Sequence, residues 1–385
     1  MKKTLMVAAL TGVFATAAHA QSSVTLYGLI DEGLTYTNNQ GGHSNWQETS
    51  GSINGSRWGL RGSEDLGGGL KAIFTLENGF TINNGQLGQS SRIFGRQAFV
   101  GLSSNQFGAV TLGRQYDSVV DYVAPLSMAW DTQFAHPFDN DNLNNSFRLD
   151  NTIKYTSVNY AGFQFGGLYG FSNNADGFDT DRSYSFGASY TYGGLKAAAG
   201  YLQLNNNPDS TLNFGASSSG SIAGDGSFVA ARQRTFGGGL NYTFGPATVG
   251  FVYTQTNLSG VGGAGTDPIH GLAVAGLAEG DSARFQNFEG NIRYALTPAL
   301  SLNGSYVYTR GNLGEISPNW NQVNLQADYF LSRRTDVYVQ GEYQHISSNS
   351  AGLAPWINGL STPSNGGADP AQSQVAVTIG MRHRF

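Results

Sequence analysis

The sequence predicts an all-β fold, a 16-stranded antiparallel transmembrane β-barrel. Three observations support this prediction. Segments of about ten residues that alternate apolar and polar side chains recur along the chain, as they do in transmembrane barrels. The connections between these segments are alternately short and long. The chain also ends on an alternating segment, VAVTIGMRHRF at residues 375–385. Because successive side chains of a strand point to opposite faces, each such segment has one apolar and one polar face.

The composition suits such a fold and excludes several other classes of protein. Charged residues are 12 % of the 385 residues, against about 25 % in an average globular protein. Glycine (54 residues) and aromatic residues (12 %) are abundant, which fits many strands joined by tight turns. The absence of cysteine excludes disulfides, cysteine metal sites and a thiol nucleophile. A formal net charge of -5 gives no general attraction to nucleic acid.

Residues 1–20, MKKTLMVAALTGVFATAAHA, have the pattern of a secretory signal peptide. Lys2 and Lys3 form the basic region, an apolar stretch follows, and Ala18-His19-Ala20 is a small-residue cleavage site. We expect the mature chain to begin at Gln21. Residues 21–385 contain no linker or shift in composition, so we expect one domain. No later apolar run is long enough to predict a membrane-spanning helix.

The predicted strands occur in pairs along the chain. The first five span residues 24–30, 56–62, 70–77, 98–104 and 109–115, and later pairs turn at 159–162, 191–194, 244–247, 296–299 and 332–335. These turns are short and rich in Gly, Pro or Asn, as tight hairpins require. The connections on the other side are long and polar and include 38–52, 117–147, 205–227, 258–282 and 347–373. We count 16 strands, seven short turns and eight long loops, with both ends of the mature chain on the short-turn side.

The side-chain alternation indicates which surroundings the two faces meet. In residues 286–296, Phe288, Ile292 and Tyr294 oppose Glu289 and Arg293. Many apolar faces end in Tyr or Phe, as in the aromatic girdle of a membrane protein. A secreted soluble β-protein is the alternative, but regular short and long connections favour a barrel in the outer membrane of a Gram-negative cell. Closing the sheet pairs every backbone group, which lipid requires. The last strand would then face lipid with its apolar side and the lumen with its polar side.

Four segments resemble the general diffusion porins of β-proteobacterial outer membranes. They are QSSVTLYGLID, GSRWGLRGSEDLGGGLKAIFTLE, AFVGLS…FGAVTLGRQYD and IGMRHRF, and together they extend the resemblance over the whole mature chain. The resemblance implies a 16-stranded barrel, a homotrimer and a long third loop folded into the lumen as a constriction. By position and length this loop is 117–147; an ordinary external loop is the alternative. Phe385 is similar to the terminal aromatic assembly signal of such barrels, although His383 departs from the usual residue at its position.

Charged side chains that face the lumen set which ions pass a pore. Trp58 and Leu60 have the apolar parity of their strand, so Arg57 and Arg61 are expected to face the lumen. In residues 147–154, the odd-numbered apolar residues Phe147, Leu149 and Ile153 are expected to face lipid. The alternate residues Arg148, Asp150 and Lys154 would then face the lumen.

The resemblance also implies a cluster of three arginines on the wall of the constriction. By alignment of the matching segments, these are Arg57, Arg96 and Arg148. Arg96 shares parity with Val100, which looks lipid-facing, so a bulge near Gly95 would be needed to turn it inward. Without that bulge, Arg96 would be a rim residue that binds lipopolysaccharide phosphates.

Acidic residues of the third loop are expected to face the arginines and to create a transverse field across the pore. They are Asp117, Asp121, Asp131, Asp139 and Asp141. The alternative is that some are solvated loop aspartates without a role in the pore. The remaining lumen charges are evenly balanced, so only the arginine cluster implied by the resemblance favours anions.

The sequence therefore predicts a porin for passive diffusion of small hydrophilic solutes and ions, weakly selective and leaning toward anions. Its expected partners are other subunits of a homotrimer, outer-membrane lipid and lipopolysaccharide, and the barrel-assembly machinery; no cofactor is implied. A barrel that acts mainly in surface recognition or adhesion is the alternative, because the long Gly-, Ser- and Asn-rich loops would be exposed.

Enzyme and ligand motifs give little support to other functions. No G-x-S-x-G segment accompanies the few histidines, which fall in loops or near the short-turn end, so we expect no catalysis. Residues 260–265 match G-x-G-x-x-G but lie in a loop with no helix behind it. Residues 139–142, Asp-Asn-Asp-Asn, resemble the start of a calcium loop. Asn144 stands where such a loop needs glycine, which leaves only incidental calcium binding open.

Overall fold

The computed structural model describes residues 22–385 except 41, 131–132, 176, 206–219, 223–227, 229, 262–279, 348–352, 359 and 361–371. The predicted signal peptide, residues 1–20, lies outside the described residues and stays a prediction. Most of the predicted loops 205–227, 258–282 and 347–373 also lie outside them. Among the described residues no helix has both the length and the apolar character needed to cross a membrane.

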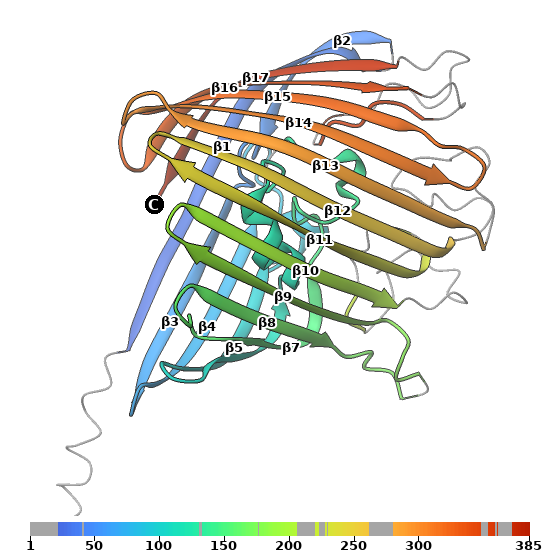
Figure 1. Ribbon diagram of the computed structural model, residues 1–385. Helices are drawn as coiled ribbons and strands as arrows, with labels where there is room; N and C mark the ends of the chain where they lie inside the picture. The colour runs from blue at the N-terminus through green and yellow to red at the C-terminus, as the bar shows by residue number, and fades with distance from the viewer. Residues whose placement is uncertain are drawn as a thin grey trace, which may run out of the picture.

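The described chain forms one antiparallel sheet that closes on itself (Figure 1). The first eight strands are β1 (Ser23–Gln40), β2 (His43–Ser50), β3 (Arg57–Gly67), β4 (Leu70–Gly79), β5 (Gln97–Ser104), β6 (Gly108–Gln115), β7 (Leu149–Thr156) and β8 (Phe163–Gly170). The others are β9 (Arg182–Tyr192), β10 (Leu195–Asn205), β11 (Ala230–Phe244), β12 (Ala247–Val261), β13 (Ser282–Ala295), β14 (Leu300–Leu313), β15 (Asn319–Phe330), β16 (Thr335–Ile346) and β17 (Ser373–Arg384). The last strand, β17, pairs with β1 and closes the barrel.

Seventeen described strands fill sixteen positions around the barrel, because β2 and β3 share one position. Both pair with β1: Glu32 of β1 lies opposite Ser50 of β2, and Leu29 of β1 lies opposite Arg57 of β3. Residues 51–56 interrupt this second barrel strand. The predicted fold class, a 16-stranded antiparallel transmembrane β-barrel, is therefore confirmed.

The prediction of a long loop at 38–52 was wrong. The first strand continues to Gln40, and His43 pairs with it across a turn at Gly42, where φ is +88°. The side chains in this hairpin are mostly polar on both faces, so the sequence carries no apolar alternation there. Trp46 is the large apolar residue of β2, and its side chain is 66 % exposed on the outside of the sheet.

The outer surface of the barrel is apolar, as the terminal segment predicted. In β17, Val377, Ile379 and Met381 are exposed, whereas Ala376 and Thr378 on the other face are buried. Exposed aromatic residues continue this surface on other strands and include Phe186, Tyr190, Phe236, Phe251, Tyr306 and Tyr343. An apolar exterior over a polar interior is the arrangement that a lipid bilayer requires of a β-barrel.

Short turns gather at one end of the barrel, where the chain ends at Phe385, and longer connections gather at the other (Figure 1). The connection between β4 and β5 contains a short helix, α2 (Gly88–Ser91). The connection between β6 and β7 contains three short helical turns, η1 (Val119–Val123), η2 (Ala124–Leu126) and η3 (Pro137–Asp139). Because short turns are periplasmic in outer-membrane barrels, the longer connections mark the cell surface.

The helical turns between β6 and β7 lie inside the barrel (Figure 1), and an apolar core lies between this connection and the wall. On the loop side it contains Val119, Val123, Leu126, Leu143 and Phe147, all almost completely buried. The wall contributes Leu168, Ala198, Leu202, Leu204 and Val252, which lie on inward faces of β8, β10 and β12. The segment 117–147 is therefore packed against one side of the lumen.

Three glycines let the start of this segment approach the wall. Gly166, Gly187 and Gly200 lie side by side on β8, β9 and β10. A Cβ atom at Gly187 would lie 2.7 Å from Cδ2 of Tyr122, and one at Gly200 would lie 3.2 Å from Cα of Val119. Side chains at these positions would push η1 into the open part of the lumen.

Candidate functional site

A group of charged side chains lines the wall opposite the packed loop. Arg96 is 3 % exposed, and its Nε lies 2.9 Å from Oε1 of Glu77. The Arg96 guanidinium also donates to the hydroxyl of Tyr116, 3.3 Å away, and that hydroxyl donates to Glu77 over 3.0 Å. Arg148 lies over the ring of Tyr116, with its Cζ atom 5.7 Å from the ring centre. Tyr116 therefore connects two arginines to one carboxylate.

Two more arginines join this group through Asp150. Nη1 of Arg114 lies 2.7 Å from Oδ1 of Asp150, and Nη2 of Arg92 lies 3.9 Å from Oδ2. Arg114 also donates to the backbone carbonyl oxygen of Gly95 over 2.7 Å. We call Arg57, Arg92, Arg96, Arg114 and Arg148 the arginine cluster.

The structure turns Arg96 inward without a bulge inside the strand. Its side chain lies beside Glu77 because β5 begins only at Gln97, after a bend at Arg96. The strand parity that links Arg96 to the lipid-facing Val100 therefore does not apply. Its burial and its contact with Glu77 leave no place for Arg96 at a lipid-facing rim.

The sequence-based prediction missed Arg92 and Arg114. Arg114 shares parity with the exposed Leu112, but the register shifts between Gly113 and Gln115, and Gly113 has a φ of +135°. This irregularity turns the Arg114 side chain inward. The glycine directly before an arginine was the available sequence signal.

The parity used for residues 147–153 was partly wrong. Ile153 is exposed on the outer face, but Phe147 and Leu149 are 1 % and 0 % exposed and belong to the apolar core inside the barrel. Asn151, with a φ of +53°, interrupts the alternation of β7. Arg148 comes before this irregularity, so the alternation of β7 does not set the direction of its side chain, which lies in the arginine cluster.

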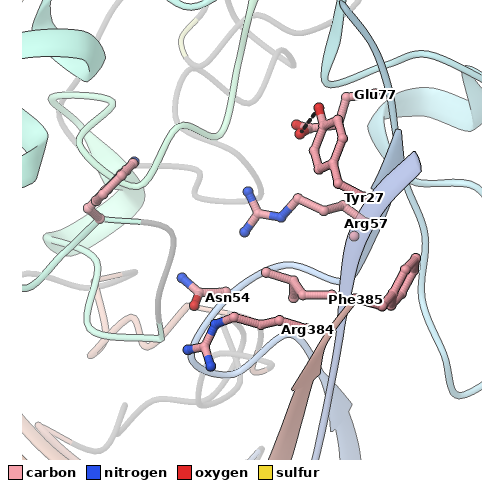
Figure 2. A pocket seen from close by; sticks show the side chains of 9 residues that line it. Tyr27, Asn54, Arg57, Glu77, Arg384 and Phe385 are labelled. Atoms are coloured by element: carbon pink, nitrogen blue, oxygen red, sulfur yellow. Dashed lines mark hydrogen bonds between the residues drawn. The ribbon is translucent and has the colours of Figure 1, made fainter. Parts of the chain in front are cut away.

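Arg57 borders the open part of the lumen (Figure 2). The opening beside it is also lined by Asn54, Trp130, Glu77 and Arg384, and the hydroxyl of Tyr27 donates to Glu77 over 2.9 Å. In Figure 2, Phe385 points to the other side of the strand, away from Arg57 and Arg384. The opening thus lies between the arginine cluster and the loop residue Trp130.

The arginine cluster contains five guanidinium groups, and the carboxylates of Glu77 and Asp150 lie among them. In a second group of charges in the lumen, Arg382 and Arg384 pair with Asp328 and Asp336. The arginine cluster thus gathers positive charge on one side of the described lumen.

Three of the loop aspartates do not face the arginine cluster. Asp117, Asp139 and Asp141 are at most 1 % exposed. Asp117 accepts hydrogen bonds from the backbone N–H groups of Val119 and Val120, and Asp139 accepts from those of Asn144 and Ser146. Burial raises the pKa of Asp117 to about 6 and that of Asp139 to about 7. These carboxylates stabilise the loop itself and present no charge to the opening.

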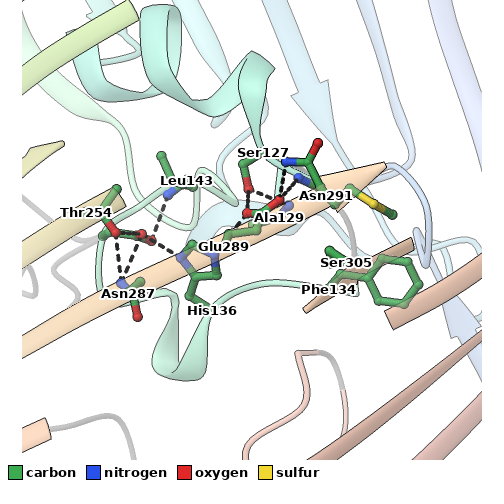
Figure 3. A network of polar contacts seen from close by, with 12 residues as sticks. Ser127, Ala129, Phe134, His136, Leu143, Thr254, Asn287, Glu289, Asn291 and Ser305 are labelled. Atoms are coloured by element: carbon green, nitrogen blue, oxygen red, sulfur yellow. Dashed lines mark hydrogen bonds and ion pairs between the residues drawn. The ribbon is translucent and has the colours of Figure 1, made fainter. Parts of the chain in front are cut away.

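Asp141 belongs to a polar network that fixes the loop to β12 and β13. Figure 3 shows His136 of this network beside Glu289 and near Asn287. The ring of His136 lies between two carboxylates, with Nδ1 2.7 Å from Asp141 and Nε2 3.1 Å from Glu289 of β13. Burial disfavours the charged ring, but the two carboxylates raise the pKa of His136 to about 10. Burial likewise disfavours the Asp141 anion, yet the adjacent His136 charge keeps its pKa below the usual range. His136 is therefore an imidazolium that donates to both carboxylates.

Further hydrogen bonds extend this attachment around the barrel. Glu289 accepts from the hydroxyl of Ser127 and from the backbone N–H of Met128, and Asn287 donates to Asp141 over 3.1 Å. At the closing strands, the side chain of Gln133 accepts from Gln340 over 2.8 Å and from Thr378 over 3.0 Å. The loop thus contacts inward-facing residues from β12 to β17.

The remaining predicted site residues have separate locations. Lys154 of β7 pairs with Asp121 and also donates to the backbone carbonyl oxygen of Tyr116 over 2.9 Å, so it holds the start of the loop. Arg61 is exposed and lies over the ring of Tyr27, 4.6 Å from its centre, closer to the short-turn end. Asp131 lies outside the described residues.

No group of three or more His, Cys, Asp or Glu side chains that could hold a metal ion occurs among the described residues. Asp139 and Asp141, the residues of the calcium-like motif, instead bond to backbone amides and to His136.

Comparisons with known proteins agree with this architecture. The family model described as Gram-negative porin matches residues 5–349. Over the full length of both chains, the sequence is 34 % identical to an outer membrane porin protein of Bordetella pertussis and 28 % identical to outer membrane porin protein 32 of Delftia acidovorans.

Solved structures show the same fold at lower sequence identity. An anion-selective porin from Comamonas acidovorans matches 95 % of this chain and 100 % of its own, with a TM-score of 0.74 and 24 % identity. OmpT of Vibrio cholerae, in its trimer form, matches 94 % of this chain and 99 % of its own, with a TM-score of 0.66 and 18 % identity. The closed barrel, its apolar exterior, its charged lumen and its relatives lead to one conclusion: this chain belongs to the Gram-negative porin family, whose members are outer-membrane diffusion channels and not enzymes.

Proposed function

We propose that this porin prefers anions and that the arginine cluster produces the preference. The observation that carries the proposal is the gathering of five guanidinium groups on one wall of the lumen, where Arg57 borders the opening. Three acidic residues of the loop, Asp117, Asp139 and Asp141, are buried in its own contacts and do not line this wall. Small hydrophilic solutes would diffuse through the same opening without a cofactor or energy source.

The physical basis is the local electric field. Charges that line a narrow, water-filled passage with low-dielectric walls act on passing ions more strongly than charges on an open surface. Residues 117–147 narrow the lumen from one side, so ions pass near the arginine cluster on the other. Rings or clusters of arginine favour anions in such pores.

The zero-current potential of the refolded protein in a planar bilayer under a potassium chloride gradient tests this proposal. We expect a potential of the sign that chloride permeation gives. The double variant R57Q/R148Q should shift the potential toward the cation side, because it removes two positive charges from the cluster. Arg333 lies exposed in a short turn outside the arginine cluster, and R333Q provides a matched control that should leave the potential unchanged.

An unchanged potential in R57Q/R148Q, with normal conductance, would remove the arginine cluster from the mechanism of selectivity. A cation-favouring potential in the native protein would contradict the anion preference but not the channel. Correctly folded protein without conductance would instead favour a barrel that acts in surface recognition. The loop segments relevant to that alternative, 206–219 and 262–279, lie outside the described residues.

We also propose partners that fit an outer-membrane barrel. The trimer form of Vibrio cholerae OmpT supports a homotrimer for this chain, which shares its fold. Phe385 closes the last strand, where its backbone exchanges two hydrogen bonds of 3.0 Å with Gly28, and its ring is 41 % exposed. That position suits a terminal signal for the barrel-assembly machinery. Lipopolysaccharide would surround the cell-surface end of the barrel.

A further inference from the structure

Five arginines lie on the outer, lipid-facing surface of the barrel. They share strand parity with exposed aromatic residues: Arg182 with Phe186, Arg232 and Arg234 with Phe236, Arg284 with Phe288, and Arg310 with Tyr306. All five lie near the ends of β9, β11, β13 and β14 that lead into the cell-surface loops. We call them the outer arginine band.

The strand register places these arginines at regular lateral intervals. Asn205 of β10 lies opposite both Arg182 of β9 and Arg232 of β11. Asn257 of β12 lies opposite both Arg234 and Arg284 in the same way. Neighbouring strands are about 4.8 Å apart, so each pair of arginines is separated by about 10 Å with an asparagine between them.

The charge on this surface is one-sided. In the described parts of β9 to β14, the outward-facing charged residues are these five arginines. The single carboxylate in those strands, Glu289, points inward to His136. No hydrogen bond or ion pair to another described side chain is formed by the guanidinium groups of Arg232, Arg234, Arg284 or Arg310, in contrast to the paired arginines of the lumen. Asp179 lines a surface hollow together with Arg182 and Arg232.

Amide and hydroxyl groups fill the surface between the arginines and the aromatic residues. The hydroxyl of Tyr201 donates to Gln203, and Gln203 donates to Asn205 over 2.6 Å. On β12 the same order recurs, with Tyr253 donating to Gln255 and Gln255 donating to Asn257. A second hollow, lined by Arg310, Gln286, Asn319, Phe288 and Tyr308, continues the surface onto β13 and β14.

Acidic groups occur on another part of the outer surface. Glu32 and Glu48 are on the outward faces of β1 and β2, next to each other in the sheet. The outer surface is therefore basic at the cell-surface end of β9–β14 and acidic on β1 and β2.

We propose that the outer arginine band binds the phosphate groups of lipid A, the glycolipid end of lipopolysaccharide. Arginine pairs with phosphate through two parallel hydrogen bonds, and amide side chains suit sugar hydroxyls. The aromatic and aliphatic residues toward the barrel centre would contact the acyl chains. A lipid that presents phosphates above a hydrocarbon region matches this order of basic, amide, tyrosine and apolar side chains. The inference gives residues to the proposed lipopolysaccharide contact and does not depend on the proposed anion preference.

Native mass spectrometry of the full-length mature protein tests the inference. The probes are bis-phosphorylated lipid A, the same lipid without phosphates, and phosphatidylglycerol. We expect the first probe to bind best. The variant R234Q/R284Q should bind it about tenfold more weakly or worse, because each basic residue near an anionic lipid surface contributes about 1 kcal/mol. The control R333Q/R334Q removes the same charge from a short turn at the opposite end and should bind like the native protein.

Equal binding of lipid A to R234Q/R284Q and to the native protein would overturn the inference, as would equal binding of its phosphorylated and dephosphorylated forms. Phosphatidylglycerol binding as tight as that of lipid A would show a general anionic-lipid surface and would also overturn the assignment to lipid A. Single-channel conductance of each variant confirms a folded barrel. It also keeps the two proposals separate. A channel without anion preference can still bind lipid A at this band, and an anion-selective channel can lack that binding.

Discussion

At the residue scale, the proposed anion preference depends on the arginine cluster and on the carboxylates of Glu77 and Asp150 that lie in it. Glu77 is held by Arg96, Tyr116 and Tyr27, whereas Asp150 bonds to Arg114 and retains a side-chain exposure of 21 %. Asp150 is thus the carboxylate of the cluster that can be neutralised with the smaller disturbance of buried contacts.

Neutralising Asp150 should strengthen the anion preference. In D150N the cluster keeps its arginines but loses one of two negative charges, so the zero-current potential should move further toward the chloride limit. The matched control is E64Q. Glu64 is exposed toward the short-turn end of β3, and its substitution removes the same charge. A potential that moves equally in both variants would trace the effect to net charge and not to the cluster.

His136 gives the loop a dependence on pH. The pKa of this ring in the folded protein is about 10, above its ordinary value of 6.5, because Asp141 and Glu289 favour the charged form. The stabilisation is complete below about pH 6.5 and is lost as the pH rises toward and through 10. Current noise from loop movement should therefore increase between pH 8 and pH 11.

The variant H136Q separates this effect from other titrations. It cannot be charged, so its current noise should be high already at pH 8 and change little with alkali. Breaking a buried charge pair of this kind costs about 3–5 kcal/mol, so hydrogen exchange in residues 127–143 should be faster than in the native protein. A native channel that is equally quiet at pH 8 and pH 11 would contradict the role of His136.

At the scale of secondary-structure elements, the strands could be predicted from sequence and the loop contacts could not. In β13 and β17, apolar and polar side chains alternate with a period of two, and this pattern can be recognised in the sequence alone. Alternation fails where the backbone leaves regular geometry: at Gly113, at Asn151 and at the start of β5. Arg96 and Arg114 lie at two of these places, so simple parity would put both side chains on the outer face, where the structure does not have them.

The loop aspartates show a second limit of sequence-based prediction. An aspartate in a long polar connection looks solvated, and nothing local indicates that Asp117 and Asp139 accept backbone hydrogen bonds inside a buried core. The apolar wall that covers this core was also missed. In β10, Leu202 and Leu204 have the opposite parity to the outward-facing Tyr201, which was the available signal.

The glycine row under the loop allows a test at this scale. In G187V the new side chain would collide with Tyr122, whose Cδ2 lies 2.7 Å from the added Cβ position. The start of the loop should be displaced into the lumen, and single-channel conductance should fall or fluctuate. The control G290V is on β13, where an added Cβ meets no atom within 4 Å, and it should conduct normally. Unchanged conductance in G187V would show that the loop start does not narrow the passage.

At the scale of the whole molecule, the charge of the outer surface differs around the circumference of the barrel. Basic side chains cover the cell-surface end of β9–β14, and Glu32 and Glu48 lie on β1 and β2. If subunits associate, the basic side is the one expected to remain in contact with the bilayer, because lipid phosphates attract its arginines. The acidic side is then the better candidate for the contact between subunits.

This arrangement predicts which substitution disturbs assembly. The variant E32R/E48R would make both sides basic and attract lipid phosphates to β1 and β2. We expect less trimer relative to monomer in unheated detergent gels, whereas R234Q/R284Q should leave the ratio unchanged. Monomer alone in the native protein would count against the homotrimer.

The contacts of Gln133 have a consequence for the order in which the barrel is made. This residue precedes its partners Gln340 and Thr378 by about two hundred residues of chain, and Thr378 belongs to the strand that closes the barrel. The loop cannot reach its final packing before the last strand arrives. A nascent barrel therefore has an unfinished passage until the seam between β1 and β17 forms, and the narrowing of the channel is completed together with its closure.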